Sequence, residues 1–262
     1  KINFWKKNCS TLKKKYLNEK FSKKSKKLDH YTFTKVISKI IPKNYIISTG
    51  SSGLAIEIFY THFENKKNQR IFLTSGLGSM GYGLPSSIGS CVANKYKKNI
   101  CLFESDGSFM FNLQELATIS SYKLPIKIFL MNNQGYASIR NTQKSFFKKN
   151  YVGTGTEDNI NYPNFKQLSE SFNIKYFKIK NIHDLKKIKN YLYYSKPILF
   201  DIILKKNEDL VPKVKTFFSK QNKIKSMPLE DLYPYLSLDE LKRHLNFPTR
   251  NTSRLVRNKI NK

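Results

Sequence analysis

The sequence predicts an α/β fold: a doubly wound, mostly parallel six-stranded sheet with helices on both faces. Two observations indicate this fold. Six short apolar runs, rich in isoleucine, phenylalanine and leucine, alternate along the chain with segments of helical length. Continuous apolar runs are typical of strands buried on both faces, and their alternation with helices is typical of parallel βαβ units.

The expected elements follow one another from residue 45 onward. Strands are expected at residues 45–49, 70–76, 99–105, 126–133, 175–180 and 197–204. Helices are expected at residues 52–63, 79–97, 108–123, 163–173 and 183–195. A long polar loop is expected from Gln134 to Tyr162, and Pro163 suits the first turn of the helix that follows it.

Composition divides the chain into three parts. Residues 1–43 are polar and basic, and a basic arm or linker is expected there. Residues 44–205 carry the strand–helix alternation and form the predicted domain. Residues 206–262 form a C-terminal tail, in which Ser237 and Glu240 make a capping box that opens a short helix. The end of this tail is expected to be mobile.

The chain is strongly basic, with 48 Lys and Arg against 18 Asp and Glu and a formal net charge of +30. Such a balance normally indicates nucleic acid or an anionic membrane as partner. Here lysine, asparagine, isoleucine and aromatic residues are all abundant, which indicates a compositional bias of the whole chain. No apolar run is long enough to span a bilayer. We therefore expect neither specific nucleic-acid binding nor a membrane partner.

The cysteines and the first residues of the chain indicate in which cellular compartment the protein is expected. Cys9, Cys91 and Cys101 show no C-x-x-C spacing, and an odd number of cysteines fits a reducing cytoplasm. The start of the chain lacks the apolar core of a signal peptide and an initiator methionine. We expect a cytoplasmic protein and a chain that is a fragment or a processed product.

A glycine-rich loop follows the second predicted strand. Gly76, Gly78 and Gly81 match the G-x-G-x-x-G pattern of dinucleotide-binding loops. Glu104 lies at the end of the next strand, where a dinucleotide-binding protein holds the ribose. NAD or FAD is therefore one alternative for this loop, although Pro85 fits poorly in the regular helix that such a site requires.

Two further strand ends carry polar residues that the dinucleotide alternative leaves unexplained. Asp106 follows one strand, and Asn133 follows the next one 27 residues later. Strand ends in a doubly wound sheet face one pocket, and a carboxylate beside a phosphate site requires a cation between the two charges. The oxygens of Asp106 and Asn133, with the carbonyl of Gly135, would suit Mg²⁺.

The motif D-G-S at residues 106–108, followed by N-N at 132–133, resembles the fingerprint of enzymes that bind thiamine diphosphate (ThDP), usually G-D-G…N-N. Longer stretches extend the likeness. The segments are TSGLGSMGYGLPSSIG (74–89), SDGSFMFNLQELATI (105–119), LPIKIFLMNNQGYASIRNTQ (124–143) and PLEDLYPYLSLDEL (228–241). Together they resemble the C-terminal, diphosphate-binding domain of proteins like the acetolactate synthase large subunit, over roughly residues 30–245.

The resemblance implies ThDP and Mg²⁺ as cofactors and assigns roles to individual residues. Asp106, Asn133 and the carbonyl of Gly135 would be the metal ligands. Gly78 would offer its carbonyl to the aminopyrimidine, and Met80 would support the thiazolium so that the cofactor bends. The full set of implied cofactor-binding residues is Gly50, Ser51, Ser52, Gly78, Met80, Asp106, Gly107, Ser108, Asn133, Gly135 and Tyr136.

The sequence departs from the family pattern in two ways. Ser105 replaces the usual first glycine of G-D-G, which puts the loop geometry in question. The activating glutamate of the family lies on a separate pyrimidine-binding domain, which nothing in this chain resembles, so no catalytic residue is expected here. The resemblance thus implies the C-terminal part of a longer enzyme or one subunit of a split enzyme, with a partner domain or subunit and a homodimer or tetramer.

The resemblance implies decarboxylation of a pyruvate-like 2-oxo acid and transfer of the resulting acyl carbanion equivalent to an acceptor. Other ThDP-dependent lyases and sugar-related carboligases remain alternatives within the family. A non-catalytic relative that only binds the cofactor, and a basic nucleic-acid-binding protein, are the alternatives of other classes.

Overall fold

The computed structural model describes residues 2–16, 28–50, 53–74, 76–219, 223–245 and 247–260. The chain divides into two compact units, Lys1–Glu208 and Asp209–Lys262. The predicted cofactor contacts Ser51 and Ser52 lie outside the described residues.

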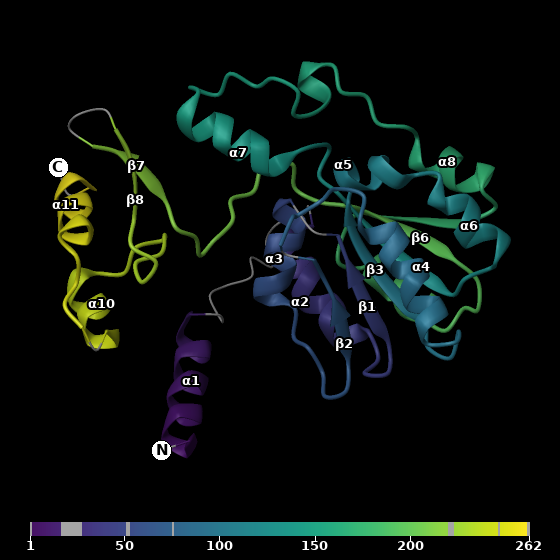
Figure 1. The fold of residues 1–262 in the computed structure, drawn as a ribbon, viewed down its shortest axis with the longest axis horizontal. Helices are drawn as coiled ribbons and strands as arrows, with labels where there is room; N and C mark the ends of the chain where they lie inside the picture. The colour runs from purple at the N-terminus through teal and green to yellow at the C-terminus, as the bar shows by residue number, and fades with distance from the viewer. Residues whose placement is uncertain are drawn as a thin grey trace. The chain divides into compact units, whose positions relative to one another are not determined.

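The first unit is built on a six-stranded sheet in the order β2-β1-β3-β4-β6-β5 (Figure 1). Every strand pair in this sheet is parallel, which confirms the predicted α/β fold class. The strands are β1 (Ile46–Thr49), β2 (Arg70–Phe72), β3 (Ile100–Ser105), β4 (Ile126–Asn132), β5 (Lys175–Ile179) and β6 (Ile198–Ile203). All six fall inside the predicted runs.

Helices cover both faces of the sheet, and each face has its own apolar core. One core packs α2 (His30–Ile40), α3 (Leu54–His62) and α9 (Leu185–Tyr191) against the strands. The other packs α4 (Gly83–Ala93), α6 (Glu115–Ser121) and α8 (Phe165–Ser171) against the opposite side. Between α4 and α6 the chain forms the short helices α5 (Asp106–Phe109) and η1 (Met110–Asn112).

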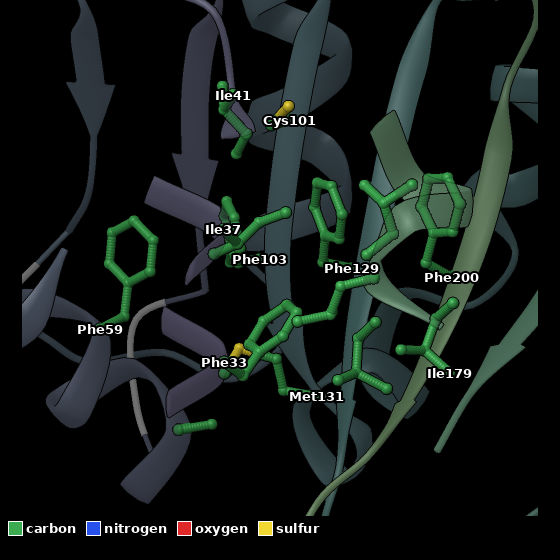
Figure 2. Packing of buried hydrophobic residues seen from close by; sticks show 14 of the residues in the cluster. Phe33, Ile37, Ile41, Phe59, Cys101, Phe103, Phe129, Met131, Ile179 and Phe200 are labelled. Carbon is green, nitrogen blue, oxygen red and sulfur yellow. The ribbon is translucent and has the colours of Figure 1, made fainter. Parts of the chain in front are cut away.

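Aromatic rings in register across the central strands order the first core (Figure 2). Phe103 pairs with Phe129, and Phe129 pairs with Phe200. The ring centroids of these pairs are 4.8 Å and 5.3 Å apart, with the planes nearly parallel. Such offset stacking adds to the free energy of burial and fixes the strand register.

The structure differs from the basic arm expected for residues 1–43. Phe33 and Ile37 of α2 and the following Ile41 are fully buried against the sheet (Figure 2). Asp29 caps the helix by accepting a 2.7 Å hydrogen bond from the backbone N–H of Thr32. Apolar residues four positions apart form one helix face, which the surrounding lysines obscure in the sequence. Of the expected arm, the helix α1 (Ile2–Tyr16) has no buried residue.

Two helices lie where a loop and a mobile end were expected. Helix α7 (Ala137–Phe146) lies inside the predicted loop, followed by the short η2 (Thr156–Asp158), and α11 (Asn251–Ile260) lies in the C-terminal tail. In α7 only Ala137 and Arg140 are buried. A helix with so few apolar contacts has no apolar periodicity for a sequence analysis to detect.

The second unit contains a hairpin of β7 (Thr216–Phe218) and β8 (Ile224–Ser226) and the helices α10 (Leu238–His244) and α11. The hydroxyl of Ser237 accepts from the N–H of Glu240 at 3.2 Å, which confirms the predicted cap of α10. Arg257 of α11 grips both carboxylate oxygens of Asp231, at 2.6 and 2.7 Å. In the part of the chain that the structure describes, no helix is both long and apolar enough to cross a membrane.

Candidate functional site

Three predicted loops meet at one edge of the sheet. Strand β1 lies between β2 and β3 in the sheet. The chain runs from β1 outward to β2 and then returns to form β3 on the other side of β1, so the order of strands reverses between β1 and β3. The N–H of Gly50, just after β1, donates to the carbonyl of Phe103 at 2.7 Å. Asp106 follows β3, and Asn133 follows the neighbouring β4. Ligands of doubly wound proteins bind at such a switch point.

Asp106 is fully buried between the loops that follow β3 and β4. Its Oδ1 accepts from the N–H of Gly107 at 2.8 Å, and its Oδ2 accepts from the N–H of Gly135 at 3.0 Å. Burial raises the pKa of this carboxyl to about 7, although the hydrogen bonds and the charge of Arg140 oppose the rise. An ionised carboxylate has about four acceptor positions, so two remain for a cation.

The side chain of Asn133 is buried, and one of its polar atoms forms no hydrogen bond with any residue that the structure describes. The side chain is 2% exposed. Its Nδ2 lies 3.2 Å from Nε2 of His30, but its Oδ1 has no hydrogen-bond partner among the described residues. A buried oxygen without a partner is costly and calls for an explanation, such as an ion.

Arg140, on α7, holds the loop that contains Asn133 and Gly135. One terminal nitrogen donates to the carbonyls of Gln134 and Thr154, at 3.1 and 2.9 Å. The other donates to the carbonyls of Asn133 and Lys206, both at 2.9 Å. The side chain is 3% exposed, so these charge-assisted bonds lie in a low-dielectric environment.

Gly135 can be nothing but glycine in this arrangement. Its φ is +129°, and an added Cβ would lie 2.2 Å from the carbonyl oxygen of Thr154. The N–H of Gly135 also donates to the Asp106 carboxylate. The same residue therefore allows the close approach of the loop around Thr154 and forms the bond to Asp106.

Ser108 and Glu104 join the strand ends to the glycine-rich loop. The hydroxyl of Ser108 accepts from the N–H of Gly81 at 2.9 Å. Glu104 is fully buried, and its Oε2 accepts from the N–H of Gly83 at 2.9 Å. A Cβ added at Gly50 or Gly83 would come within about 2 Å of the Glu104 carboxylate. Glu104 therefore faces inward, which removes the acid that the dinucleotide alternative needs for a ribose.

The remaining predicted residues lie on the two flanking loops. Gly78 adopts a φ of +63°, and Met80 is 40% exposed in the same loop. Tyr136 lies over Gly107, where an added Cβ would be 2.4 Å from the tyrosine ring. Gly107 is thus required by the packing of Tyr136 on the loop that follows β3.

Comparison with known proteins identifies the family. Residues 49–202 match the family described as thiamine pyrophosphate enzyme, C-terminal TPP binding domain, thiamine pyrophosphate being ThDP. The chain belongs to this family. A relative, the acetolactate synthase large subunit of Porphyra purpurea, is 34% identical over 189 residues, which cover 68% of this chain and 31% of that protein. That of Cyanidium caldarium is 39% identical over 142 residues, covering 54% and 24%.

A solved structure supports the fold of this TPP-binding domain. The ThDP-dependent 4-hydroxybenzoylformate decarboxylase of Rhodococcus jostii RHA1 superposes with a TM-score of 0.63 at 20% identity, over 73% of this chain and 35% of that one. The chain spans about a third of the length of the relatives and of this structure.

The TPP-binding domain offers donors that fit a hard cation. Asp106 supplies a buried carboxylate, and Asn133 supplies the oxygen that lacks a partner among the described residues. The carbonyl of Gly135 accepts from the N–H of Ala137 at 3.1 Å and keeps a second lone pair. Carboxylate, amide and carbonyl oxygens are the ligands of Mg²⁺ and Ca²⁺.

Sequence reasoning missed three residues of this TPP-binding domain. Arg140 and His30 were not among the predicted site residues, and no motif includes Glu208, which contacts His30. Most basic residues of this chain are lysines, so the choice of arginine at position 140 is the one local signal that could have indicated a role in the site. The other two act through contacts that no local pattern reveals.

The buried carboxylates make the stability of the TPP-binding domain depend on pH. Burial raises the pKa of Glu104 from 4.5 to about 7, and that of Asp106 from 3.8 to about 7. The folded state therefore keeps protons that the unfolded state releases. Their stabilising contribution is complete below about pH 4 and disappears as the pH rises through about 7, at about 1.4 kcal/mol per pKa unit.

We expect the free energy of unfolding without cofactor to fall between pH 5 and pH 8, and to fall less steeply in Glu104→Gln. Urea unfolding at several pH values measures both slopes. Glu170→Gln, an exposed change on α8, serves as the control and should keep the wild-type slope. An unchanged slope in Glu104→Gln would contradict this origin of the pH dependence.

Proposed function

We propose that the chain is the metal- and diphosphate-binding part of a ThDP- and Mg²⁺-dependent enzyme like acetolactate synthase. Such an enzyme decarboxylates a pyruvate-like 2-oxo acid and transfers the resulting acyl carbanion equivalent to an acceptor. The observation that carries the proposal is that the buried Asp106 carboxylate and the Asn133 oxygen without a partner among the described residues lie at adjacent strand ends of a TPP-binding domain. The names of the relatives support the reaction class.

Each residue of the site has a task that follows from its position. Asp106, Asn133 and the carbonyl of Gly135 would hold Mg²⁺, and Gly107 and Ser108 would contact the diphosphate. Arg140 fixes the Asn133–Gly135 loop, so these oxygens are positioned before any ligand arrives. When bound, ThDP supplies the carbanion and the electron sink of the reaction.

The proposal includes a second protein part. The relatives are about three times as long as the matched segment, so they carry further domains. We propose that the activating glutamate comes from a pyrimidine-binding domain or subunit, in a homodimer or tetramer. Two alternatives remain. A sugar-related carboligase would use a different substrate, and a relative that binds the cofactor without turnover would catalyse no reaction.

Calorimetry with ThDP, in the presence and absence of Mg²⁺, tests the cofactor site. We expect binding that requires Mg²⁺, measured with the pyrimidine-binding part supplied. Absence of binding under these conditions would overturn the proposal. Consumption of pyruvate by the same preparation would then separate an enzyme from a relative that only binds the cofactor.

Replacing Met80 with alanine should lower ThDP-dependent turnover by about tenfold while the protein stays folded, because a lost support displaces the reacting ring. Met80 is 40% exposed, so its truncation removes little core packing. Steady-state turnover, with the melting temperature as a check of folding, measures the effect. Leu77→Ala, in the same loop and 93% exposed, is the control and should behave as wild type. Equal turnover in both variants would remove Met80 from the site.

A further inference from the structure

We propose that His30, held by Glu208, is a positioning residue that turns the carboxamide oxygen of Asn133 toward the metal. The inference rests on the proposed function, since it concerns the ion that Asn133 would bind. Neither His30 nor Glu208 lies within the segment that matches the family, residues 49–202.

His30 is fully buried and contacts both residues. Its Nδ1 lies 2.6 Å from Oε2 of Glu208, and its backbone N–H donates to the same oxygen at 2.9 Å. On the other side of the ring, Nε2 lies 3.2 Å from Nδ2 of Asn133. Glu208, His30 and Asn133 thus form a continuous chain of polar contacts from the end of the first unit to the loop after β4.

The chemistry of these groups decides the orientation of the amide. A carboxylate only accepts hydrogen bonds, so the proton of a neutral imidazole lies on Nδ1 and points to Glu208. Nε2 is then an acceptor, and it can be satisfied only by the NH₂ group of Asn133. A flipped amide would set the Asn133 oxygen against the lone pair of Nε2. The oxygen is therefore directed away from His30, where it has no partner among the described residues.

Further contacts hold the Glu208–His30–Asn133 series in place. Leu28 forms a parallel bridge with Leu204, and the N–H of Lys205 donates to the carbonyl of Leu28 at 3.0 Å. Asn141, on α7, donates from Nδ2 to the carbonyl of Glu208 at 3.0 Å. The backbone of Glu208 is thus held by a neighbouring helix, and its carboxylate by the backbone N–H of His30 at the start of α2. Residues that orient a ligating side chain in this way typically change metal affinity by about 10- to 100-fold when replaced.

The affinity for Mn²⁺, used as a paramagnetic substitute for Mg²⁺, tests the inference. Free Mn²⁺ is measured by electron paramagnetic resonance at saturating ThDP, with the pyrimidine-binding part supplied. In His30→Phe the ring volume stays but the acceptor is lost, so we expect the affinity to fall at least tenfold. In His30→Gln the amide oxygen can accept from Asn133 while its NH₂ donates to Glu208, so most of the affinity should return.

A matched control separates positioning from general loss of packing. Thr34 is buried one turn along the same helix, and its hydroxyl has no partner among the described residues. Thr34→Val should leave Mn²⁺ affinity unchanged. A purely structural role for His30 would lower the melting temperature of the metal-free protein without distinguishing the two His30 variants in their Mn²⁺ affinity.

The outcomes separate this inference from the proposed function. If the wild-type protein does not bind Mn²⁺ with ThDP, the proposed function fails and the inference fails with it. If the wild type binds and His30→Phe binds equally well, only the inference is overturned. Should His30→Phe not fold, Glu208→Leu takes its place. Without the carboxylate the imidazole proton can lie on Nε2, which then no longer accepts from Asn133, and the same loss of Mn²⁺ affinity is expected. Unchanged affinity in Glu208→Leu would equally overturn the inference.

Discussion

Replacing Asp106 with asparagine should abolish Mg²⁺-dependent binding of ThDP while the protein remains folded. The carboxylate is the one buried acidic group among the proposed metal ligands, and the amide would leave the cation without a countercharge. We expect the affinity for Mg²⁺ to fall by at least about 100-fold, since an interaction with a buried, ionised group is lost. Calorimetric titration of Mg²⁺ at saturating ThDP, with the pyrimidine-binding part supplied, measures the loss.

The same substitution should spare the stability of the metal-free protein. At pH 8 the wild type carries a buried carboxylate whose pKa burial has raised to about 7, and asparagine removes the cost of ionising it. Asparagine keeps an acceptor for only one of the N–H groups of Gly107 and Gly135, and this loss offsets the gain, so the melting temperature without cofactor should stay close to that of the wild type. Asp184→Asn, the same chemical change beside α9, should leave Mg²⁺ affinity intact. Retained Mg²⁺ affinity in Asp106→Asn would exclude Asp106 as a metal ligand.

Replacing Gly135 with alanine should destabilise the protein by about 3 kcal/mol, because a side chain is strained at positive φ and the added methyl meets backbone. The φ of Gly135 is +129°, and the added Cβ would lie 2.2 Å from the carbonyl oxygen of Thr154. This nearest atom belongs to the backbone, so rotation of a side chain cannot relieve the clash. Urea unfolding measures the free energy, and Mg²⁺ affinity should fall with it, since the loop that carries Asn133 must move.

Gly89 provides the matched control for this change. It lies in α4, is exposed, and an added Cβ would meet nothing within 4 Å. Alanine there should stabilise the protein by up to about 1 kcal/mol, because alanine favours a helix more than glycine does. If Gly135→Ala proved as stable as Gly89→Ala, the tight contact between the 135 and 154 loops would be wrong.

The sequence predicted the sheet and the loops at its edge because both depend on local patterns. Apolar runs located the six strands, and the rule that strand ends face one pocket placed Asp106 and Asn133 close together. The roles of single residues, such as Met80 and Gly78, stay predictions that the variants above will test.

Long-range contacts account for what sequence reasoning missed. His30 meets Asn133 across 103 positions and Glu208 across 178. No spacing rule links such residues, and the lysine-rich residues before α2 made the whole segment 1–43 resemble a basic arm. The contacts of Arg140 were not predicted for a related reason: its partners are backbone carbonyls, which every residue type carries.

The bonds from Arg140 to Lys206 and from His30 to Glu208 tie the loop that carries Asn133 to residues beyond the family match. A recombinant fragment trimmed to the family match, residues 49–202, would lack both anchors. Boundaries at residues 28 and 208 would keep them and the Leu28–Leu204 bridge. Anyone who dissects this protein by truncation should therefore place the cuts by these contacts rather than by the extent of sequence similarity.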